Sequence, residues 1–331
     1  MTDVAVVGAG SWGTVLANML AHKGDRVVLW AYEPEVAAEV NARHRNDLFL
    51  PEAPLHPSLA ATNDIAAAVG SADVVVSAAP SHAVRAVMAQ AAPALRREAL
   101  VISASKGLEL AGLKRMTEVL GEVLAGAEIV ALSGPTFARE LYEQQPTAAA
   151  VAGAPAAAQR AQLVLTAPYF RTYTNDDVIG VELGGALKNV VAIAAGILEG
   201  LGLGNNPRAA LITRGLAEIA RLGVAMGAKP LTFAGLAGMG DLLLTATGPL
   251  SRNRSLGVEL GRGATLQQVQ AKRLSVAEGV GTAKAAVALG ERVGVELPIA
   301  REVACVLFDG KPARQAIADL MERTLKAEAA A

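Results

Sequence analysis

Short runs rich in valine and isoleucine alternate with helical segments over the first half of the chain. Seven of these runs are predicted to be strands: residues 4–7, 27–30, 74–78, 100–103, 129–132, 147–151 and 170–174. Signals for helix starts lie between them, such as Pro34 after Glu33 and Asp64 before Ile65. This alternation is typical of a parallel sheet wrapped by helices.

After Asp177 the strand signal fades, and long segments rich in alanine, leucine and glycine follow with helical spacing. We therefore predict an α/β fold class, with an α/β domain over residues 1–177 and an all-α domain over residues 178–331. Residues 44–62 contain three prolines and are predicted to form a long surface loop.

A glycine motif joins the first predicted strand to the first predicted helix. Gly8, Gly10 and Gly13 have the G-x-G-x-x-G spacing of a dinucleotide-binding loop. In such a loop the first glycine permits a sharp turn, the second lets the backbone approach a pyrophosphate, and the third lets the helix pack on the strand. An ordinary tight turn would need only part of this pattern, so the position of the motif favours a Rossmann domain that binds NAD or NADP.

The end of the second predicted strand leaves the choice between NAD and NADP open. A ribose-binding acid is expected there, but Ala31 and Tyr32 follow the strand and Glu33 is the nearest acidic residue. Glu33 could equally be a helix-start residue before Pro34. No arginine stands at this strand end to hold a 2'-phosphate.

A single lysine, Lys188, interrupts a long apolar segment in the second half of the chain. Gly184 and Gly185 lie one helical turn before it, which suggests that another group approaches this helix surface closely. Burial would lower the pKa of such a lysine and would suit it to exchange a proton with a carbonyl or alcohol oxygen. The alternatives are that Lys188 extends outward to solvent or pairs with Glu182.

Other polar residues stand where a ligand would be expected. Lys106 follows the strand 100–103, at the carboxyl end where such sheets bind ligands. Gly134 and Thr136 follow the strand 129–132, although Thr136 could simply cap a helix.

Two further stretches in the second half of the chain also carry polar residues that could bind a ligand. Asp241 follows a glycine-rich turn, where it could also be a helix cap. Arg252 and Arg254 flank Asn253, a combination suited to a phosphate because a guanidinium binds two of its oxygens. A solvated loop is the alternative for this arginine pair.

Composition and charge exclude several classes of protein. The formal net charge of −1 gives no basic surface for nucleic acid, and 52% hydrophobic content excludes extensive disorder. The single cysteine, Cys305, excludes an intramolecular disulfide, and the four histidines lack the spacing of a metal site. Since no export signal and no membrane-spanning segment are evident, we expect a soluble, cytoplasmic protein with small-molecule partners and no membrane insertion.

The motifs GAGSWG, SKGLE, SGPTFARE, GVELGGALKN, GLAGMGDLLLT, SRNRS and VAEG follow one another across almost the whole chain. In this order they resemble the NAD(P)-dependent glycerol-3-phosphate dehydrogenases of bacteria. The resemblance implies an N-terminal Rossmann domain, a helical C-terminal domain and a homodimer. It also implies interconversion of dihydroxyacetone phosphate and sn-glycerol 3-phosphate for phospholipid synthesis.

The same resemblance assigns roles to individual residues. Lys188 is similar to the proton donor and acceptor of the family, and Lys106 to a second lysine at the substrate. The implied substrate contacts are Lys106, Gly134, Thr136, Lys188, Asp241, Ser251, Arg252 and Asn253. The implied cofactor contacts are Gly8, Gly10, Ser11, Trp12, Gly13, Lys106, Ala138, Arg252, Val276 and Glu278. In many members a basic residue that favours NADP follows the second strand, and Ala-Tyr-Glu replaces it here.

Three other functions fit parts of the pattern. Another two-domain dehydrogenase could use a helix-borne lysine on a different hydroxy acid or sugar phosphate. A non-catalytic dinucleotide sensor would keep the glycine loop but would not need Lys106, Lys188 and the Ser-Arg-Asn stretch together. A methyltransferase would need a catalytic segment that the sequence does not offer.

Overall fold

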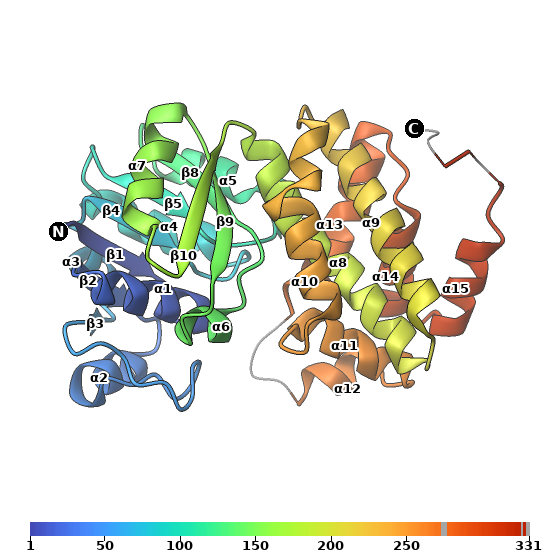
Figure 1. Ribbon diagram of the computed structural model, residues 1–331, viewed down its shortest axis with the longest axis horizontal. Coiled ribbons are helices and arrows are strands. Elements are labelled where there is room, and N and C mark those ends of the chain that lie inside the picture. Colours follow the sequence, from blue (N-terminus) through green and yellow to red (C-terminus); the bar gives the residue numbers. More distant parts are fainter. Residues whose placement is uncertain (273–276, 326, 329–331) are drawn as a thin grey trace. The chain divides into compact units, whose positions relative to one another are not determined.

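The chain folds into two compact units (Figure 1). The first unit comprises residues 1–106 and 114–181, and the second comprises residues 107–113 and 182–331. The computed structural model describes residues 1–272, 277–325 and 327–328.

An eight-stranded sheet forms the centre of the first unit, with strand order β10-β9-β8-β5-β4-β1-β2-β3. Its strands are β1 (Asp3–Val7), β2 (Arg26–Trp30), β3 (Ala60–Thr62), β4 (Val74–Ser77), β5 (Leu100–Ser103), β8 (Glu128–Ser133), β9 (Thr147–Ala152) and β10 (Phe170–Asn175). The seven strands predicted from the sequence are all present, and each bound lies within one residue of its prediction. The prediction of a parallel sheet is wrong at one junction, because β9 pairs antiparallel with β8 while β10 pairs parallel with β9.

Helices cover both faces of this sheet, which explains why its strands are apolar on both sides. Alternate residues of β1 enter different cores: Val4 and Val6 pack with α1 and α7, whereas Ala5 and Val7 pack with α3, α4 and α5. The helices of the unit are α1 (Ser11–His22), α2 (Pro34–Arg43), α3 (Ile65–Val69), α4 (Val84–Ala91), α5 (Met116–Val123), α6 (Ala138–Tyr142) and α7 (Pro155–Leu165), with a 3-10 turn η1 (Ala92–Ala94).

The segment 44–62 is not the surface loop that its prolines suggested. It ends in β3, which pairs with β2 and extends the sheet. Leu50, Leu55 and Leu59 from this segment are buried in the core beside α1. The apolar residues between the prolines therefore decide its placement, and they make the segment part of the domain core.

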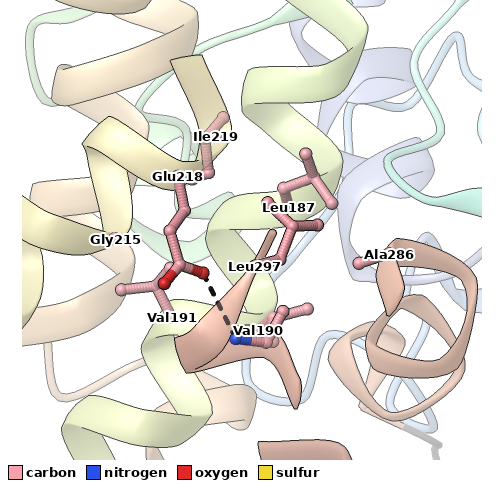
Figure 2. Close-up of a pocket in the computed structure, with 9 residues that line it drawn as sticks. Leu187, Val190, Val191, Gly215, Glu218, Ile219, Ala286 and Leu297 are labelled. Atoms are coloured by element: carbon pink, nitrogen blue, oxygen red, sulfur yellow. Dashed lines mark hydrogen bonds between the residues drawn. The ribbon is translucent and has the colours of Figure 1, made fainter. Parts of the chain in front are cut away.

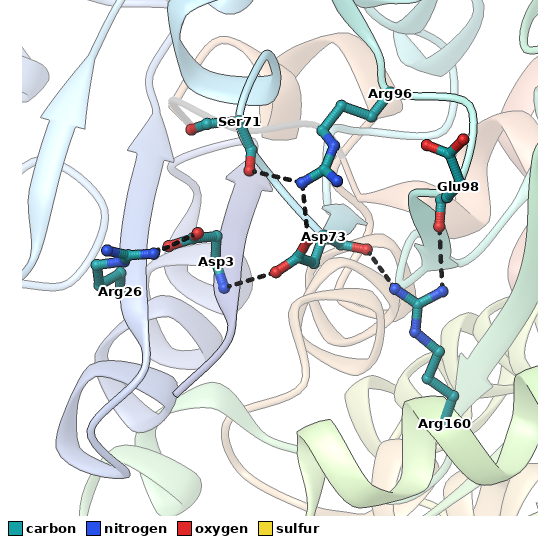
Figure 3. A network of polar contacts seen from close by, with 7 residues as sticks. All are labelled: Asp3, Arg26, Ser71, Asp73, Arg96, Glu98 and Arg160. Carbon is teal, nitrogen blue, oxygen red and sulfur yellow. Dashed lines mark hydrogen bonds and ion pairs between the residues drawn. The ribbon is translucent and has the colours of Figure 1, made fainter.

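A polar network joins the amino ends of the parallel strands in the first unit (Figure 3). The Asp73 carboxylate accepts hydrogen bonds from the Arg96 guanidinium at 2.8 Å and from the Asp3 backbone N–H at 3.4 Å. Arg160 of α7 donates to the Asp73 carbonyl at 2.9 Å, and Arg26 forms an ion pair with Asp3. These contacts cross-link β1, β2, β4 and α7 at the edge of the sheet opposite to the strand ends where ligands of such folds bind.

The second unit is helical among its described residues, apart from the two-residue strand β6 (Leu108–Glu109). Another two-residue strand, β7 (Lys114–Arg115), precedes α5 in the first unit. The helices are α8 (Val178–Gly200), α9 (Asn205–Ala225), α10 (Asp241–Thr247), α11 (Arg252–Gly261), α12 (Leu266–Gln270), α13 (Glu278–Val293), α14 (Pro298–Phe308) and α15 (Ala313–Met321). Two irregular turns, η2 (Pro230–Ala234) and η3 (Leu236–Gly240), precede α10.

Helix α8 is long and apolar enough to cross a bilayer by length and composition, yet 78% of its most apolar window is buried inside the fold. Its burial depends on glycines that bring it into backbone contact with α11. A Cβ atom on Gly257 would lie 2.0 Å from the Ile193 carbonyl oxygen, and one on Gly196 would lie 2.0 Å from the Arg254 carbonyl oxygen. Side chains at these positions would force the helices apart, so glycine is required on both sides of the contact.

We predict that Gly257→Ala lowers the free energy of unfolding by about 3 kcal/mol or more, because the added methyl group overlaps the α8 backbone. Gly281→Ala is the matched control, because within 4 Å a Cβ there would meet only Leu110 Cδ1, at 3.8 Å. The control should gain about 0.5–1 kcal/mol from helix propensity. Urea unfolding of both variants measures the difference, and equal midpoints would contradict the proposed backbone contact.

Candidate active site

The glycine loop after β1 has the geometry of a dinucleotide cradle. Gly8 has φ of +121°, and a Cβ there would lie 2.8 Å from the Ala78 backbone. A Cβ on Gly13 would lie 1.9 Å from the Gly8 carbonyl oxygen, whereas one on Gly10 would meet nothing within 4 Å. Gly10 is the N-cap of α1 and provides no side-chain cap. The space beside the Gly10 backbone is therefore open at the start of α1, which would let a pyrophosphate approach the N-terminus of this helix.

A buried asparagine holds this loop in place, and the sequence analysis missed it. The Asn46 side-chain amide donates to the Ala9 carbonyl and to the Thr14 hydroxyl, each at 2.8 Å. Ser11, a predicted cofactor contact, donates its hydroxyl to the Phe49 carbonyl at 2.5 Å. Asn46 lies inside the segment that was interpreted as a surface loop, so no sequence signal marked it.

The chain leaves β2 beside the glycine loop, since the Gly8 backbone N–H donates to the Trp30 carbonyl at 3.0 Å. Tyr32 is 76% exposed, and its ring meets the Trp30 ring edge to face. Glu33 is the N-cap residue of α2, but its carboxylate makes no capping hydrogen bond. Glu33 is therefore a helix-start residue, as one interpretation of the sequence predicted, but its carboxylate does not cap the helix.

Lys106, Gly134 and Thr136 come together in the first unit, at the carboxyl ends of β5 and β8. The Lys106 ammonium donates to the Gly134 carbonyl at 2.8 Å and to the Thr136 hydroxyl at 3.3 Å. Gly134 has φ of +150°, and a Cβ there would lie 2.9 Å from Ala149 Cα, so the turn requires glycine. Thr136 does not cap a helix, because α6 begins at Ala138 with Phe137 as its N-cap.

Lys188 lies in the second unit and is buried against a carboxylate. Its ammonium donates to the Asp241 carboxylate at 2.5 Å and to the Thr245 hydroxyl at 2.6 Å. The side chains of Lys188 and Asp241 are 8% and 1% exposed. The alternative of a solvent-exposed side chain is wrong, because Lys188 is buried and has an ion-pair partner in Asp241 that the sequence did not suggest. Asp241 is not a helix cap, since Gly240 is the N-cap of α10.

Gly184, one helical turn before Lys188, leaves room for the backbone segment that leads to Asp241. A Cβ on Gly184 would lie 2.5 Å from the Ala237 carbonyl oxygen and 3.3 Å from Gly238 Cα. The group that approaches α8 closely at Gly184 is therefore the backbone of η3, which leads directly into Asp241. This close approach brings the carboxylate within reach of Lys188, and it confirms the prediction that another group lies close to α8 at Gly184.

Asn253 connects three helices beside Lys188. Its side-chain amide donates to the Asn189 side chain at 2.9 Å, and its oxygen accepts the Gly279 backbone N–H at 3.0 Å. Ser251 is the N-cap of α11 and accepts the Arg254 backbone N–H at 3.1 Å. These bonds explain Ser251 and Asn253 structurally, so their contact with a phosphate stays a prediction.

The two arginines of the Ser-Arg-Asn-Arg stretch differ in their surroundings. Arg254 forms an ion pair with Glu199 and donates to the Gly248 carbonyl at 3.0 Å, so it stabilises the unit. Arg252 is exposed at the first position of α11. Glu278 is the first residue of α13. Val276, a predicted cofactor contact, lies outside the described residues.

Two models of one protein family match most of the chain. The N-terminal model of the NAD-dependent glycerol-3-phosphate dehydrogenases matches residues 3–159, and the C-terminal model matches residues 177–318. The chain belongs to this family.

The dehydrogenase is similar over nearly its full length to curated relatives. It is 54% identical over 329 residues to a glycerol-3-phosphate dehydrogenase [NAD(P)+] of Geobacter sp. (strain M21), covering 98% of each chain. It is 55% identical over 330 residues to a protein of the same name from Geobacter sulfurreducens, again covering 98% of each. The crystal structure of the Coxiella burnetii glycerol-3-phosphate dehydrogenase matches with a TM-score of 0.94 and 38% identity, covering 97% of this chain and 99% of that one.

Two residues of the second unit join the candidate site because of the geometry. Thr245 shares the Lys188 ammonium with Asp241, and Asn189 pairs with Asn253. Thr245 lies one helical turn after Asp241 and Asn189 directly follows Lys188, so helical spacing could have indicated both once Lys188 and Asp241 were chosen. Among the described residues no group of three or more His, Cys, Asp or Glu side chains is placed to hold a metal ion.

We predict that Lys188→Met lowers kcat by about 100-fold or more, because it removes the buried ammonium group that we expect to donate a proton to the substrate. NADH binding, measured by fluorescence titration, should stay close to wild type, since the glycine loop belongs to the other unit. Thr245→Val should lower kcat by about tenfold through the loss of one hydrogen bond to the ammonium, while Thr245→Ser should retain activity. A near-normal kcat for Lys188→Met would remove Lys188 from catalysis.

Proposed function

We propose that this dehydrogenase interconverts dihydroxyacetone phosphate and sn-glycerol 3-phosphate. The observation that carries the proposal is the buried Lys188 ammonium, which is oriented by Asp241 at 2.5 Å and Thr245 at 2.6 Å. A buried lysine without a partner would lose its charge, whereas an adjacent carboxylate favours the charged form. An ammonium held in this way can donate a proton to a carbonyl oxygen and recover it from the alcohol in the reverse direction.

When bound, the nicotinamide of NADH or NADPH supplies the hydride for C2 of the substrate. Lys188 then donates its proton to the C2 oxygen, so that the ketone becomes an alcohol. Lys106 provides a second positive charge, whose position is set by the Gly134 carbonyl at 2.8 Å, and this charge would stabilise the developing alkoxide. Arg252 would hold the substrate phosphate and so orient C2.

The end of β2 favours NAD over NADP in this proposal. Glu33 does not use its carboxylate to cap α2, and an acid at this strand end can bind the two ribose hydroxyls of NAD. Glu35 adds a second carboxylate in the first turn of α2. Both would repel the 2'-phosphate of NADP, while the exposed Tyr32 ring could lie against the adenine.

Oxidation of NADH and NADPH at 340 nm with dihydroxyacetone phosphate tests the activity and the cofactor preference together. We expect turnover with both cofactors and a kcat/KM for NADH at least about tenfold higher, since a like-charge contact costs about 1.4 kcal/mol or more. Glu33→Gln should reduce this preference, whereas Glu39→Gln, later on α2, should not. Equal use of both cofactors would contradict the preference alone, and no turnover with either would contradict the function.

The phosphate site is tested separately with Arg252→Ala. We expect the KM for dihydroxyacetone phosphate to rise by about 10- to 100-fold with a smaller change in kcat, because a charge-assisted bond to the substrate is lost. Arg262→Ala is the control, since Arg262 lies at the opposite end of α11 as its C-cap. An unchanged KM in Arg252→Ala would exclude this arginine from the phosphate site.

The remaining assignments extend the same proposal. Residues 1–177 would bind the cofactor, with contacts from Gly8, Ser11, Trp12 and Ala138, and residues 178–331 would carry the catalytic lysine. We also infer a cytoplasmic homodimer without membrane insertion, which supplies sn-glycerol 3-phosphate for phospholipid synthesis. These inferences rest on the family to which the chain belongs and on the burial of α8.

A further inference from the structure

Glu218 is a buried carboxylate that the proposed chemistry does not use. It lies on α9, is 7% exposed, and points to the N-terminus of α14 (Figure 2). Its Oε1 accepts the Ile299 backbone N–H at 2.8 Å, and its Oε2 accepts the Ala300 backbone N–H at 3.4 Å. One carboxylate from a distant helix therefore serves two backbone N–H groups at the start of α14.

Helix α14 needs this carboxylate because its own sequence gives it no cap. The N-cap residue is Leu297, which has no side-chain acceptor, and Pro298 follows it without a backbone N–H. The first N–H groups of a helix have no intrahelical partner, and burying them without one would cost free energy. Glu218 supplies this acceptor from α9.

A cavity of about 20 Å³ lies beside this carboxylate, large enough for one water molecule. Besides Glu218, the residues that line it are Leu187, Val190 and Val191 of α8, Gly215 and Ile219 of α9, Ala286 of α13, and Leu297 and Ala300 at the start of α14. Glu218 is the one ionisable residue among them. A charged Glu218 would thus have one water-sized space in which to gain hydration.

The cavity reaches the catalytic segment of α8. Leu187 and Val190 line the cavity, and they flank Lys188 and Asn189 in sequence. Helix α9 also approaches α8 closely one turn before Glu218, since a Cβ on Gly215 would lie 2.6 Å from Val191 Cγ1. A change in packing at Glu218 would therefore act directly on the helix that holds Lys188.

The surroundings of Glu218 favour its neutral form. Burial raises the pKa of Glu218 from 4.5 to about 7, against the opposing effects of the Ile299 and Ala300 N–H bonds and of Arg221 and Arg323. Since this pKa is higher in the folded protein than in the unfolded chain, the stabilisation is fully present below about pH 4.5 and is lost as pH rises to about 7. Deprotonation of the buried Glu218 side chain therefore destabilises the folded protein.

Other charged groups near this position have partners of their own. Arg323 pairs with Glu296 at 3.0 Å, and Lys188 on α8 pairs with Asp241. The faces that α8 and α13 turn toward the cavity are apolar, with Leu187, Val190, Val191 and Ala286.

We propose that Glu218 is a positioning residue for the dehydrogenase reaction: its neutral carboxyl group holds α9 and α14 against the Lys188 segment of α8, and its charged form draws water into the cavity and loosens this contact. The inference rests on the proposed role of Lys188 in catalysis. Because small displacements of a catalytic group lower the rate steeply, the loosening would reduce kcat more than KM.

The test compares kcat of wild type and Glu218→Gln across pH, because glutamine keeps the size and one acceptor but cannot ionise. All other titrating groups are shared, so the ratio of the two kcat values isolates Glu218. We expect a wild-type to variant ratio of about 1 near pH 6 that falls to roughly one third or less near pH 8.5, with KM for dihydroxyacetone phosphate unchanged. A ratio that is constant with pH would overturn the proposal.

Glu291→Gln is the matched control. It removes a carboxylate from α13 that forms an exposed ion pair with Arg301 of α14 at 3.0 Å, and it makes the same change in net charge. Its kcat ratio to wild type should not vary with pH. The same pH dependence in this variant would mean that surface charge, and not the Glu218 position, causes the effect.

Hydrogen exchange tests the mechanical link without relying on activity or on a variant that folds well. In wild type, backbone protection at residues 299–302 and at residues 186–192 should fall together as pH rises through about 7, after correction for the intrinsic exchange rate. A fall confined to the α14 segment, or none at all, would overturn the coupling. Absence of dehydrogenase activity would instead contradict the proposed function and leave this measurement valid.

Discussion

The ion pair between Lys188 and Asp241 is the constraint on which the second unit depends. An ammonium inside an apolar helix is costly unless a charged or polar partner lies within hydrogen-bond distance. Asp241 meets this need from another helix, 53 residues later in the chain, and Thr245 adds a second acceptor one turn further along α10. The apolar character of α8 makes this pair necessary, and the pair in turn fixes where α10 lies.

Close backbone approach makes this arrangement possible. Gly184 lets the backbone of Ala237 reach α8 just before Asp241, and the glycines of α8 and α11 place the Ser251 to Asn253 stretch near Asn189. With only 3% aromatic residues, the chain forms its core mainly from alanine, valine and leucine. Glycines at the helix contacts then determine how closely α8 and its neighbours approach one another. Packing of this kind tolerates little added volume, which suits a site that must hold a lysine in one orientation.

The candidate site residues of the first unit are positioned by strands and turns, whereas those of the second unit are positioned by helix packing. Its strands carry apolar side chains into two cores, and its functional groups lie in the turns after the strands, where backbone geometry decides what they can bind. Gly10 leaves an open position at the start of α1, while Asn46 keeps the loop in shape from within a segment that contributes Leu50 and Leu55 to the core. The glycine loop, our candidate for cofactor binding, is therefore supported by the hydrophobic core itself.

The sequence by itself determined seven of the eight strands of the large sheet, the change to helices after Asp177, the glycine loop and Lys188 as the residue to explain, because these depend on local periodicity and spacing. It did not reveal that β9 runs antiparallel to β8, that residues 44–62 enter the core, or that Asp241 is the partner of Lys188. Nor did it indicate that Glu218 caps a helix that begins 80 residues later. Only the tertiary structure decided these points, because each depends on a contact between segments distant in the chain, whose cost or gain appears only when both are buried together.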